Sequence, residues 1–152
     1  MAGKRTIAIE RVDHIGIRVA DTSRAMAFYG MLGFELHYDV PYDEVVIIKN
    51  AHDVEINLIT NADNPNDGKN ILMDVADKFA GVTHLAFRVQ SIRQTMEVLA
   101  EHGVEITQGP VKFGDDGQVS VFVRDPDRNV IELRGREEDL SALGGVEHYT
   151  PE

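Results

Sequence analysis

The sequence predicts an α+β fold of two tandem βαβββ modules, and the main evidence is an internal repeat. Residues 13–19 read Asp-His-Ile-Gly-Ile-Arg-Val, and residues 83–89, seventy positions later, read Thr-His-Leu-Ala-Phe-Arg-Val. Both stretches alternate with the two-residue period of a strand, so one face is apolar and the other carries His, a small residue and Arg. Residues 33–36 and 103–106 match at the same offset. The repeat indicates a duplicated half-size unit.

The first module, residues 11–60, is expected to contain one strand, one helix and three further strands. The first strand ends at Asp21, a residue type that caps helices, and Gly33 stops the apolar stripe that follows. The expected strands cover residues 11–19, 36–40, 45–49 and 54–60. Pro41 closes the second of these strands.

The second module, residues 81–135, is expected to repeat this order after a linker at residues 61–80. The expected elements are strands at 81–89, 104–108, 118–124 and 130–134 and a helix at 91–102. Residues 109–117 are expected to form a loop, and residues 136–152 a C-terminal tail. The last strands are aligned at an offset of 77, which puts Glu55 over Glu132. All 152 residues are expected to form a single domain.

Composition narrows the range of functions. Lys and Arg number 15 against 26 Asp and Glu, a net charge of -11, and there is no basic run, which argues against a nucleic-acid partner. The chain has no Cys, so a metal ion would be held by His, carboxylate or water. Neither a signal peptide nor a long apolar run is present, so we expect a cytoplasmic protein without a membrane partner.

Four residues recur as matched pairs, His14 with Glu55 and His84 with Glu132. Each Glu lies within a strand between apolar neighbours, where an unpaired carboxylate would cost several kcal/mol. If the two sheets close on each other, two imidazoles and two carboxylates can bind one divalent cation: Zn, Ni, Co, Mn or Fe(II). The other histidines have no matched partner and are expected at the surface. These are His37, His52, His102 and His148.

Four motifs together resemble the vicinal oxygen chelate superfamily over residues 12–134. The motifs are Asp-His-Ile-Gly-Ile at 13–17, Phe-Tyr-Gly-Met-Leu-Gly-Phe at 28–34, Thr-His-Leu-Ala-Phe at 83–87, and 122–133, which contains Asp-Pro-Asp-Arg-Asn. The resemblance implies that the paired modules form a cupped, mixed sheet around a metal. It also places His14, Glu55, His84 and Glu132 at the four ligand positions of that family.

The His-Glu-His-Glu set is similar to that of lactoylglutathione lyase (glyoxalase I). The resemblance implies that Arg18 contacts the glutathione carboxylate, with glutathione as a cosubstrate. Residues 109–112, which end in Lys112, resemble a loop near the active site of that enzyme, so Lys112 is a candidate substrate-binding residue. The chain departs from the enzyme where an Asn commonly follows the second ligand by four residues. Ile59 is found there instead, although Asn57 and Asn61 are near.

A divalent cation that holds two vicinal oxygens stabilises an enediolate, so a proton on the neighbouring carbon becomes removable. We therefore expect a metal-dependent lyase or isomerase, with Glu132 and Glu55 carrying the proton. Arg18 and Arg88 either bind substrate or neutralise nearby acids. The alternatives are an epimerase of a keto-sugar, cyclitol or acyl thioester, and a non-catalytic antibiotic-binding resistance protein. An extradiol dioxygenase is disfavoured by the fourth ligand. A small-molecule substrate is expected. A homodimer is also expected, because a half-open cup leaves apolar edges that need to be covered.

Overall fold

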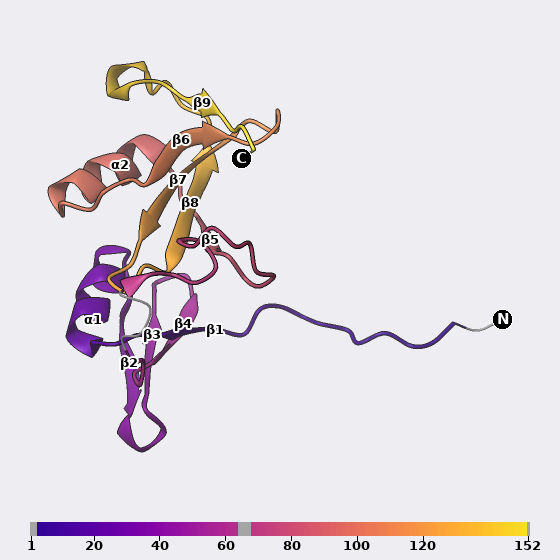
Figure 1. Cartoon of the computed structure of the whole chain (residues 1–152), viewed down its shortest axis with the longest axis vertical. Helices are drawn as coiled ribbons and strands as arrows, with labels where there is room; N and C mark the ends of the chain where they lie inside the picture. Colours follow the sequence, from indigo (N-terminus) through magenta and orange to yellow (C-terminus); the bar gives the residue numbers. More distant parts are fainter. Residues whose placement is uncertain (1–2, 64–67, 152) are drawn as a thin grey trace. The chain divides into compact units, whose positions relative to one another are not determined.

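The computed structural model describes residues 3–63 and 68–151. It divides the chain into two compact units, Met1–Asp63 and Asn64–Glu152, and each is described here by itself (Figure 1). Parts of the expected N-terminal lead-in, linker and tail, at residues 1–2, 64–67 and 152, lie outside the described residues. No helix in the described ranges is long and apolar enough to cross a membrane.

The first unit has the expected βαβββ order. Its elements are β1 (Ile15–Arg18), α1 (Thr22–Met31), β2 (Glu35–Val40), the 3₁₀ turn η1 (Pro41–Asp43), β3 (Val45–Lys49) and β4 (Glu55–Ile59). The sheet order is β1-β4-β3-β2. Strands β1 and β4 are parallel, whereas β3 pairs antiparallel with both of its neighbours. The first and last strands of the module are therefore adjacent, although about forty residues separate them in sequence.

Local sequence explains how the helix of this unit begins and what it buries. The Asp21 side chain accepts a hydrogen bond from the Arg24 backbone N–H at 2.8 Å and caps α1, as expected. Ala25, Phe28 and Tyr29 of α1 are buried. Ile56 and Leu58 of β4 are also buried, and so are Ile17 and Val19 at β1. The opposite face at β1 therefore presents His14, Gly16 and Arg18.

The second unit repeats this order and adds a short strand. Its elements are β5 (Leu85–Arg88), α2 (Ile92–Glu101), β6 (Gln108–Lys112), β7 (Gln118–Arg124), β8 (Val130–Arg136), the 3₁₀ turn η3 (Ser141–Leu143) and β9 (Glu147–His148). The sheet order is β5-β8-β7-β6-β9. The Ser91 hydroxyl caps α2, and Ile92 and Leu99 bury its inner face. The two helices and two mixed sheets confirm the expected α+β class.

One expected strand of this unit is wrong. The sequence placed it at residues 104–108 with a loop after it, whereas β6 covers Gln108–Lys112. The position is set by the partner strand, because Gln108 pairs with Phe122 and Val111 pairs with Ser120. Lys112 is therefore at the end of a strand, and not in a loop. The tail adds β9 to this strand in parallel, with Val111 opposite Glu147.

The Asp74 carboxylate holds part of the second unit together. It accepts hydrogen bonds from Arg128 Nε at 2.7 Å, from the Asn70 backbone N–H at 2.7 Å and from Arg124 Nη1 at 3.2 Å. The Arg128 hydrogen bond is the main cause that lowers the pKa of Asp74 far below its usual value, and Asn70 and Arg124 add to it. A carboxyl with a lowered folded pKa binds fewer protons folded than unfolded, so it stabilises the fold above its unfolded pKa and loses this effect in acid.

We expect Asp74→Asn to cost about 1–3 kcal/mol of unfolding free energy at pH 7, because charged hydrogen bonds are lost. The difference from wild type should shrink as the pH falls below about 4, where the unfolded carboxyl takes up its proton. Urea unfolding between pH 3 and 7 measures this. Asp77→Asn, at an exposed position three residues away, is the control and should change little. A pH-independent loss in Asp74→Asn would contradict the assignment.

Candidate metal centre

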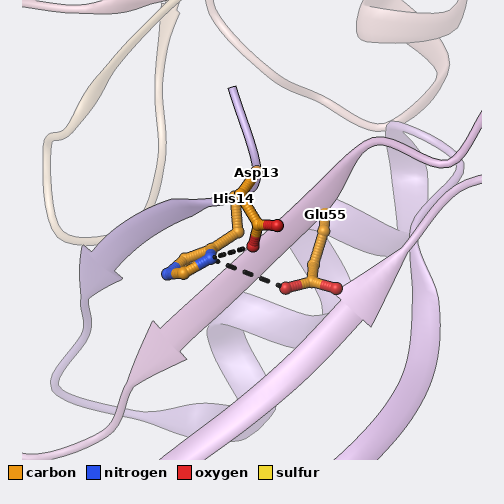
Figure 2. A group of neighbouring side chains, drawn as sticks. All are labelled: Asp13, His14 and Glu55. Atoms are coloured by element: carbon orange, nitrogen blue, oxygen red, sulfur yellow. Dashed lines mark hydrogen bonds and ion pairs between the residues drawn. The ribbon is translucent and has the colours of Figure 1, made fainter. Parts of the chain in front are cut away.

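One histidine–carboxylate cluster lies where β1 begins, in the first unit. Figure 2 shows the Asp13, His14 and Glu55 side chains converging there, with one imidazole nitrogen of His14 turned toward both carboxylates and the other pointing away. His14 Nδ1 is 2.7 Å from Asp13 Oδ1 and 3.9 Å from Glu55 Oε2. A carboxylate only accepts, so Nδ1–H is the donor to Asp13. This hydrogen bond is the main cause that lowers the pKa of Asp13 below its usual value.

A second histidine–carboxylate pair lies where β5 begins, in the second unit, and has closer geometry. His84 Nε2 is 3.0 Å from Glu132 Oε2 on the neighbouring strand β8. On its other side, His84 Nδ1 is 2.8 Å from the Thr83 hydroxyl. The edge of the His84 ring also lies against the Phe122 ring, with centroids 5.7 Å apart. The imidazole is thus fixed on three sides.

The two histidines are oriented in the same way, because each Nδ1 contacts the side chain of the preceding residue. Asp13 and Thr83 occupy equivalent positions in the two modules. Metal-binding histidines commonly use one ring nitrogen for such an orienting hydrogen bond and the other as the ligand. A hydroxyl can donate or accept, so Thr83 supports His84 in either tautomer. The arrangement leaves Nε2 as the ligand atom in both histidines.

Glu132 is a buried carboxylate, only 6% exposed. Its Oε1 accepts a hydrogen bond from the Ser120 hydroxyl at 2.6 Å, and Arg134 Nη1 lies 3.8 Å from the same atom. Its Oε2 faces His84. Adjacent ligands of an octahedral ion with bonds of about 2.1 Å lie about 3 Å apart. The 3.0 Å separation of His84 Nε2 and Glu132 Oε2 therefore fits two ligands of one divalent cation.

Strand register does not support the expected equivalence of Glu55 and Glu132. In the first unit Ile15 is opposite Ile56, and in the second unit Leu85 is opposite Ile131. Leu85 follows Ile15 by 70 residues, whereas Ile131 follows Ile56 by 75, so the last strands align at 75 and not at 77. Gly16 is opposite Asn57, and Ala86 is opposite Glu132. Asn57, and not Glu55, is the positional counterpart of Glu132.

Glu55 and Asn57 share one face of β4 but have different surroundings. Glu55 Oε1 is 3.5 Å from Lys49 Nζ, and the two residues are directly opposite on β4 and β3. Asn57 Oδ1 is buried and has no hydrogen-bond partner within residues 3–63 and 68–151. A buried polar atom without a partner costs about 1–3 kcal/mol. The orphaned amide oxygen therefore fits a bound group with which it can pair, such as a cation.

The three proposed substrate-binding cations each have a contact in the structure. Arg18 Nε donates to Asn61 Oδ1 at 3.1 Å, and Arg88 Nη1 donates to Gln118 Oε1 at 2.7 Å. Both arginines lie on the face of their strand that carries His. Lys112 forms an ion pair with Glu137, which occupies its charge. The two arginines remain candidates for binding an anionic substrate, with Asn61 or Gln118 positioning them.

The structure thus brings His14 near Glu55 within one unit and His84 near Glu132 within the other. The four unmatched histidines are exposed, as expected. Sequence reasoning missed Ser120 and Arg134, which contact Glu132. Arg134 could have been found, because it follows Glu132 by two residues and shares its face. Ser120 gives no local signal, since only the pairing of β7 with β8 places it there.

The Ser120 hydrogen bond gives a testable expectation for the site. We expect Ser120→Ala to weaken divalent-metal binding by about tenfold, because a residue that orients a ligand typically contributes 10–100-fold to metal affinity. Titration calorimetry with Mn²⁺ measures the change. Ser141→Ala is a matched control, since the Ser141 hydroxyl donates to an exposed carboxylate, Asp139, at the same 2.6 Å. Equal effects of the two substitutions would contradict a specific role for Ser120.

Two βαβββ units, each with a histidine at the start of its first strand and a carboxylate beside it, define a class of paired-module proteins. The chain belongs to this class by sequence as well. The profile of the Glyoxalase/Bleomycin resistance protein/Dioxygenase superfamily matches residues 11–133, so the protein is a member of that superfamily.

Two relatives agree with this membership, and a solved structure shares the fold. The chain is 30% identical to the glyoxalase domain-containing protein RDO1 of Mycosarcoma maydis over 133 residues. The aligned region covers 86% of this chain and 70% of RDO1. It is 27% identical to the virulence protein STM3117 of Salmonella typhimurium over 132 residues. That alignment covers 82% of this chain and 83% of STM3117. The crystal structure of a glyoxalase/dioxygenase from Nostoc punctiforme superposes with a TM-score of 0.69 at 23% identity. The superposition covers 90% of this chain and 100% of the Nostoc chain.

Proposed function

We propose that this protein is a divalent-metal-dependent lyase or isomerase that removes a proton next to a carbonyl in a small substrate with vicinal oxygens. Its ligands are His14, His84, Glu132 and an oxygen donor from β4, for which the face of the strand offers Glu55 and Asn57. The proposed ions are Zn, Ni, Co, Mn or Fe(II), and glutathione is a proposed cosubstrate.

The observation that supports this proposal best is the pair formed by His84 and Glu132. The carboxylate is buried, one oxygen is held by Ser120 and the other lies 3.0 Å from the imidazole. A buried acid with an oriented imidazole is expected of a metal or catalytic site far more than of a surface ion pair. In the first unit, Asp13, His14 and Glu55 offer ligand atoms that lie within 4.8 Å of one another, and His14 and Glu55 are among the remaining proposed donors.

A divalent ion would polarise the substrate carbonyl and stabilise the enediolate that forms when the proton leaves. Glu132 is the proposed base: Ser120 holds its Oε1, and its Oε2, the proposed ligand atom, would have to leave the ion to accept the proton. The phenyl ring of Phe122 packs against the His84 imidazole in a T-shaped contact and helps to hold it beside Glu132. Glu55 is the proposed second carboxylate, which returns the proton to the neighbouring carbon in an isomerisation or to the other face in an epimerisation.

Arg18 and Arg88 are proposed to bind an anionic part of the substrate. Each is exposed, on the His-bearing face of its strand, and each is positioned by an amide oxygen. Lys112 is the weakest of the three candidates, because Glu137 already neutralises it. Replacement of Arg18 or Arg88 by Leu should therefore raise KM for an anionic substrate more than replacement of Lys112 does.

Solvent-deuterium uptake tests the proposed chemistry. A panel of α-hydroxy ketones, dicarbonyl–thiol adducts and acyl thioesters is incubated in D₂O with metal-loaded protein, and NMR follows exchange next to the carbonyl. Exchange that stops with chelator and returns with Mn²⁺ or Ni²⁺ supports the proposal. Elemental analysis should give one ion per site. Tight binding of an antibiotic that metal removal leaves unchanged would support the non-catalytic alternative instead.

A second candidate function, Fe(II)-dependent oxygenation, is favoured by the register of β4. With Asn57 opposite Gly16, the donors other than the amide reduce to His14, His84 and Glu132, and two histidines with one carboxylate are the usual Fe(II) ligands of oxygenases. The sequence disfavoured this function because Glu55 was expected to be a fourth ligand. Consumption of O₂ with Fe(II) and a catechol distinguishes it from proton exchange, which needs no O₂.

We also propose a homodimer. The residues between 7 and 12 include three apolar side chains that are at least 77% exposed: Ile7, Ile9 and Val12. Covering them would release their apolar surface from water. Sedimentation equilibrium should give twice the mass of 16.9 kDa, and a clean monomer would contradict the proposal.

A further inference from the structure

We infer that Asn57, and not Glu55, is the oxygen donor that the first module supplies to the bound ion. The inference rests on the proposed metal site and assigns the one donor that sequence and register place differently. It also predicts the charge of the substrate, because an amide leaves the site with one negative charge fewer than a carboxylate would.

Asn57 and Glu132 hold equivalent positions in their sheets. Asn57 is opposite Gly16 in β1, just as Glu132 is opposite Ala86 in β5. The neighbouring antiparallel strand agrees, because Ile47 is opposite Asn57 and Phe122 is opposite Glu132. Two independent strand pairs therefore align Asn57 with the carboxylate that contacts His84. Gly16 has no side chain that could cover this position, and a Cβ there would meet only Ile59, at 3.6 Å.

The Asn57 side-chain oxygen lacks a polar partner, whereas the Glu55 carboxylate has one. Asn57 Oδ1 is buried without a partner in the described part of the chain, whereas Glu55 has Lys49 directly opposite. The counterpart of Glu55 in the second unit is Val130, which has no donor atom in its side chain. Glu55 therefore already has a structural partner in the sheet, and Asn57 lacks one. Amide oxygens are ordinary ligands of hard divalent cations.

The proposed donors set the charge that a substrate would meet. With one carboxylate, two neutral imidazoles and one amide as ligands, a divalent ion would keep a single positive charge, which a second carboxylate ligand would cancel. Arg18 and Arg88 are exposed, each on the His-bearing face of its own strand. A substrate that binds the ion through two oxygens, one of them anionic, complements this charge best. The expected class is an α-hydroxy or α-keto acid, a catecholate or a similar anionic chelate.

Substitutions at the two β4 positions test the inference with readouts that do not depend on turnover. We expect Asn57→Ala to weaken Mn²⁺ binding about tenfold by calorimetry and Glu55→Gln to change it less than twofold. Asn57→Asp should strengthen Mn²⁺ binding about tenfold, a change of the size that one added close charge can produce. Oxalate, an anionic chelate, should bind the Mn²⁺-loaded Asn57→Asp protein about tenfold more weakly than wild type, so the two affinities move in opposite directions.

The outcomes separate this inference from the proposed function. If Glu55→Gln weakens Mn²⁺ binding and Asn57→Ala does not, Glu55 is the ligand and the inference is wrong, while the proposed metal site stands. If wild-type protein and His84→Ala bind Mn²⁺ equally weakly, the proposed site itself fails. Circular dichroism shows whether Asn57→Ala folds, and Asn57→Asp, which nearly keeps the shape of the side chain, gives the test if it does not.

Discussion

Glu132→Gln is expected to abolish metal-dependent proton exchange, with a loss of about a thousandfold or more, because the variant lacks both the base and a charged ligand. Gln keeps the shape of the side chain, and the Ser120 hydroxyl can still donate to its amide oxygen. The fold should therefore survive. Mn²⁺ affinity should fall in the same variant by at least about tenfold, since one of the ligand charges is lost.

Deuterium exchange and Mn²⁺ calorimetry on the same preparation measure these effects together. Glu97→Gln, on an exposed position of α2, is the control for a charge change of the same sign and should leave both readouts unchanged. Full exchange activity in Glu132→Gln would remove the base from the proposed mechanism. Loss of exchange with unchanged metal affinity would keep Glu132 as the base and exclude it as a ligand.

Tyr29→Ala is expected to destabilise the first unit by about 3–5 kcal/mol, the usual cost of truncating a large buried aromatic side chain. Tyr29 is 0% exposed, and its ring contacts Phe28 and Phe34 edge to face, with centroids 5.1 Å and 6.3 Å away. The truncation leaves a cavity beside Phe28 and Phe34. Chemical denaturation measures the loss of unfolding free energy.

Tyr42→Ala provides a matched control for this truncation. Tyr42 follows Pro41 in η1 and is 81% exposed, so its removal should change the unfolding free energy by no more than about 0.5 kcal/mol. Similar losses in the two variants would show that Tyr29 does not form the core of the unit. A large loss confined to Tyr29→Ala would support it.

Much of the fold could be predicted because its signals are local. The His-small-Arg repeat, the capping residues Asp21 and Ser91 and the alternation of β7 are all readable from neighbouring residues. The position of β6 was not readable, since Thr107 and Gln108 contact Phe122, fourteen or more residues away. Pairing with a distant strand decides where this strand begins, and residues 104–108 carry no sign of it.

The candidate site shows the same limit more sharply. Val54-Glu55-Ile56 and Ile56-Asn57-Leu58 are both apolar-polar-apolar, and a strand pattern repeats every two residues. A shift of two residues therefore leaves every side chain on the same face, so sequence alone could not choose between Glu55 and Asn57. Glu55 was expected to be the ligand because a carboxylate is a more common metal ligand than an amide. Only the partner strand distinguishes the two positions, because it fixes which one lies beside Gly16.

The contact between each histidine and the residue before it has an evolutionary consequence. Asp13 and Thr83 orient their imidazoles without help from any distant segment, so each half of the chain carries its own pre-set nitrogen donor. A gene for one half could therefore have functioned as a symmetric pair before fusion. After fusion, the residue before each histidine was free to diverge, and Asp13 and Thr83 now orient the two imidazoles through groups of different charge.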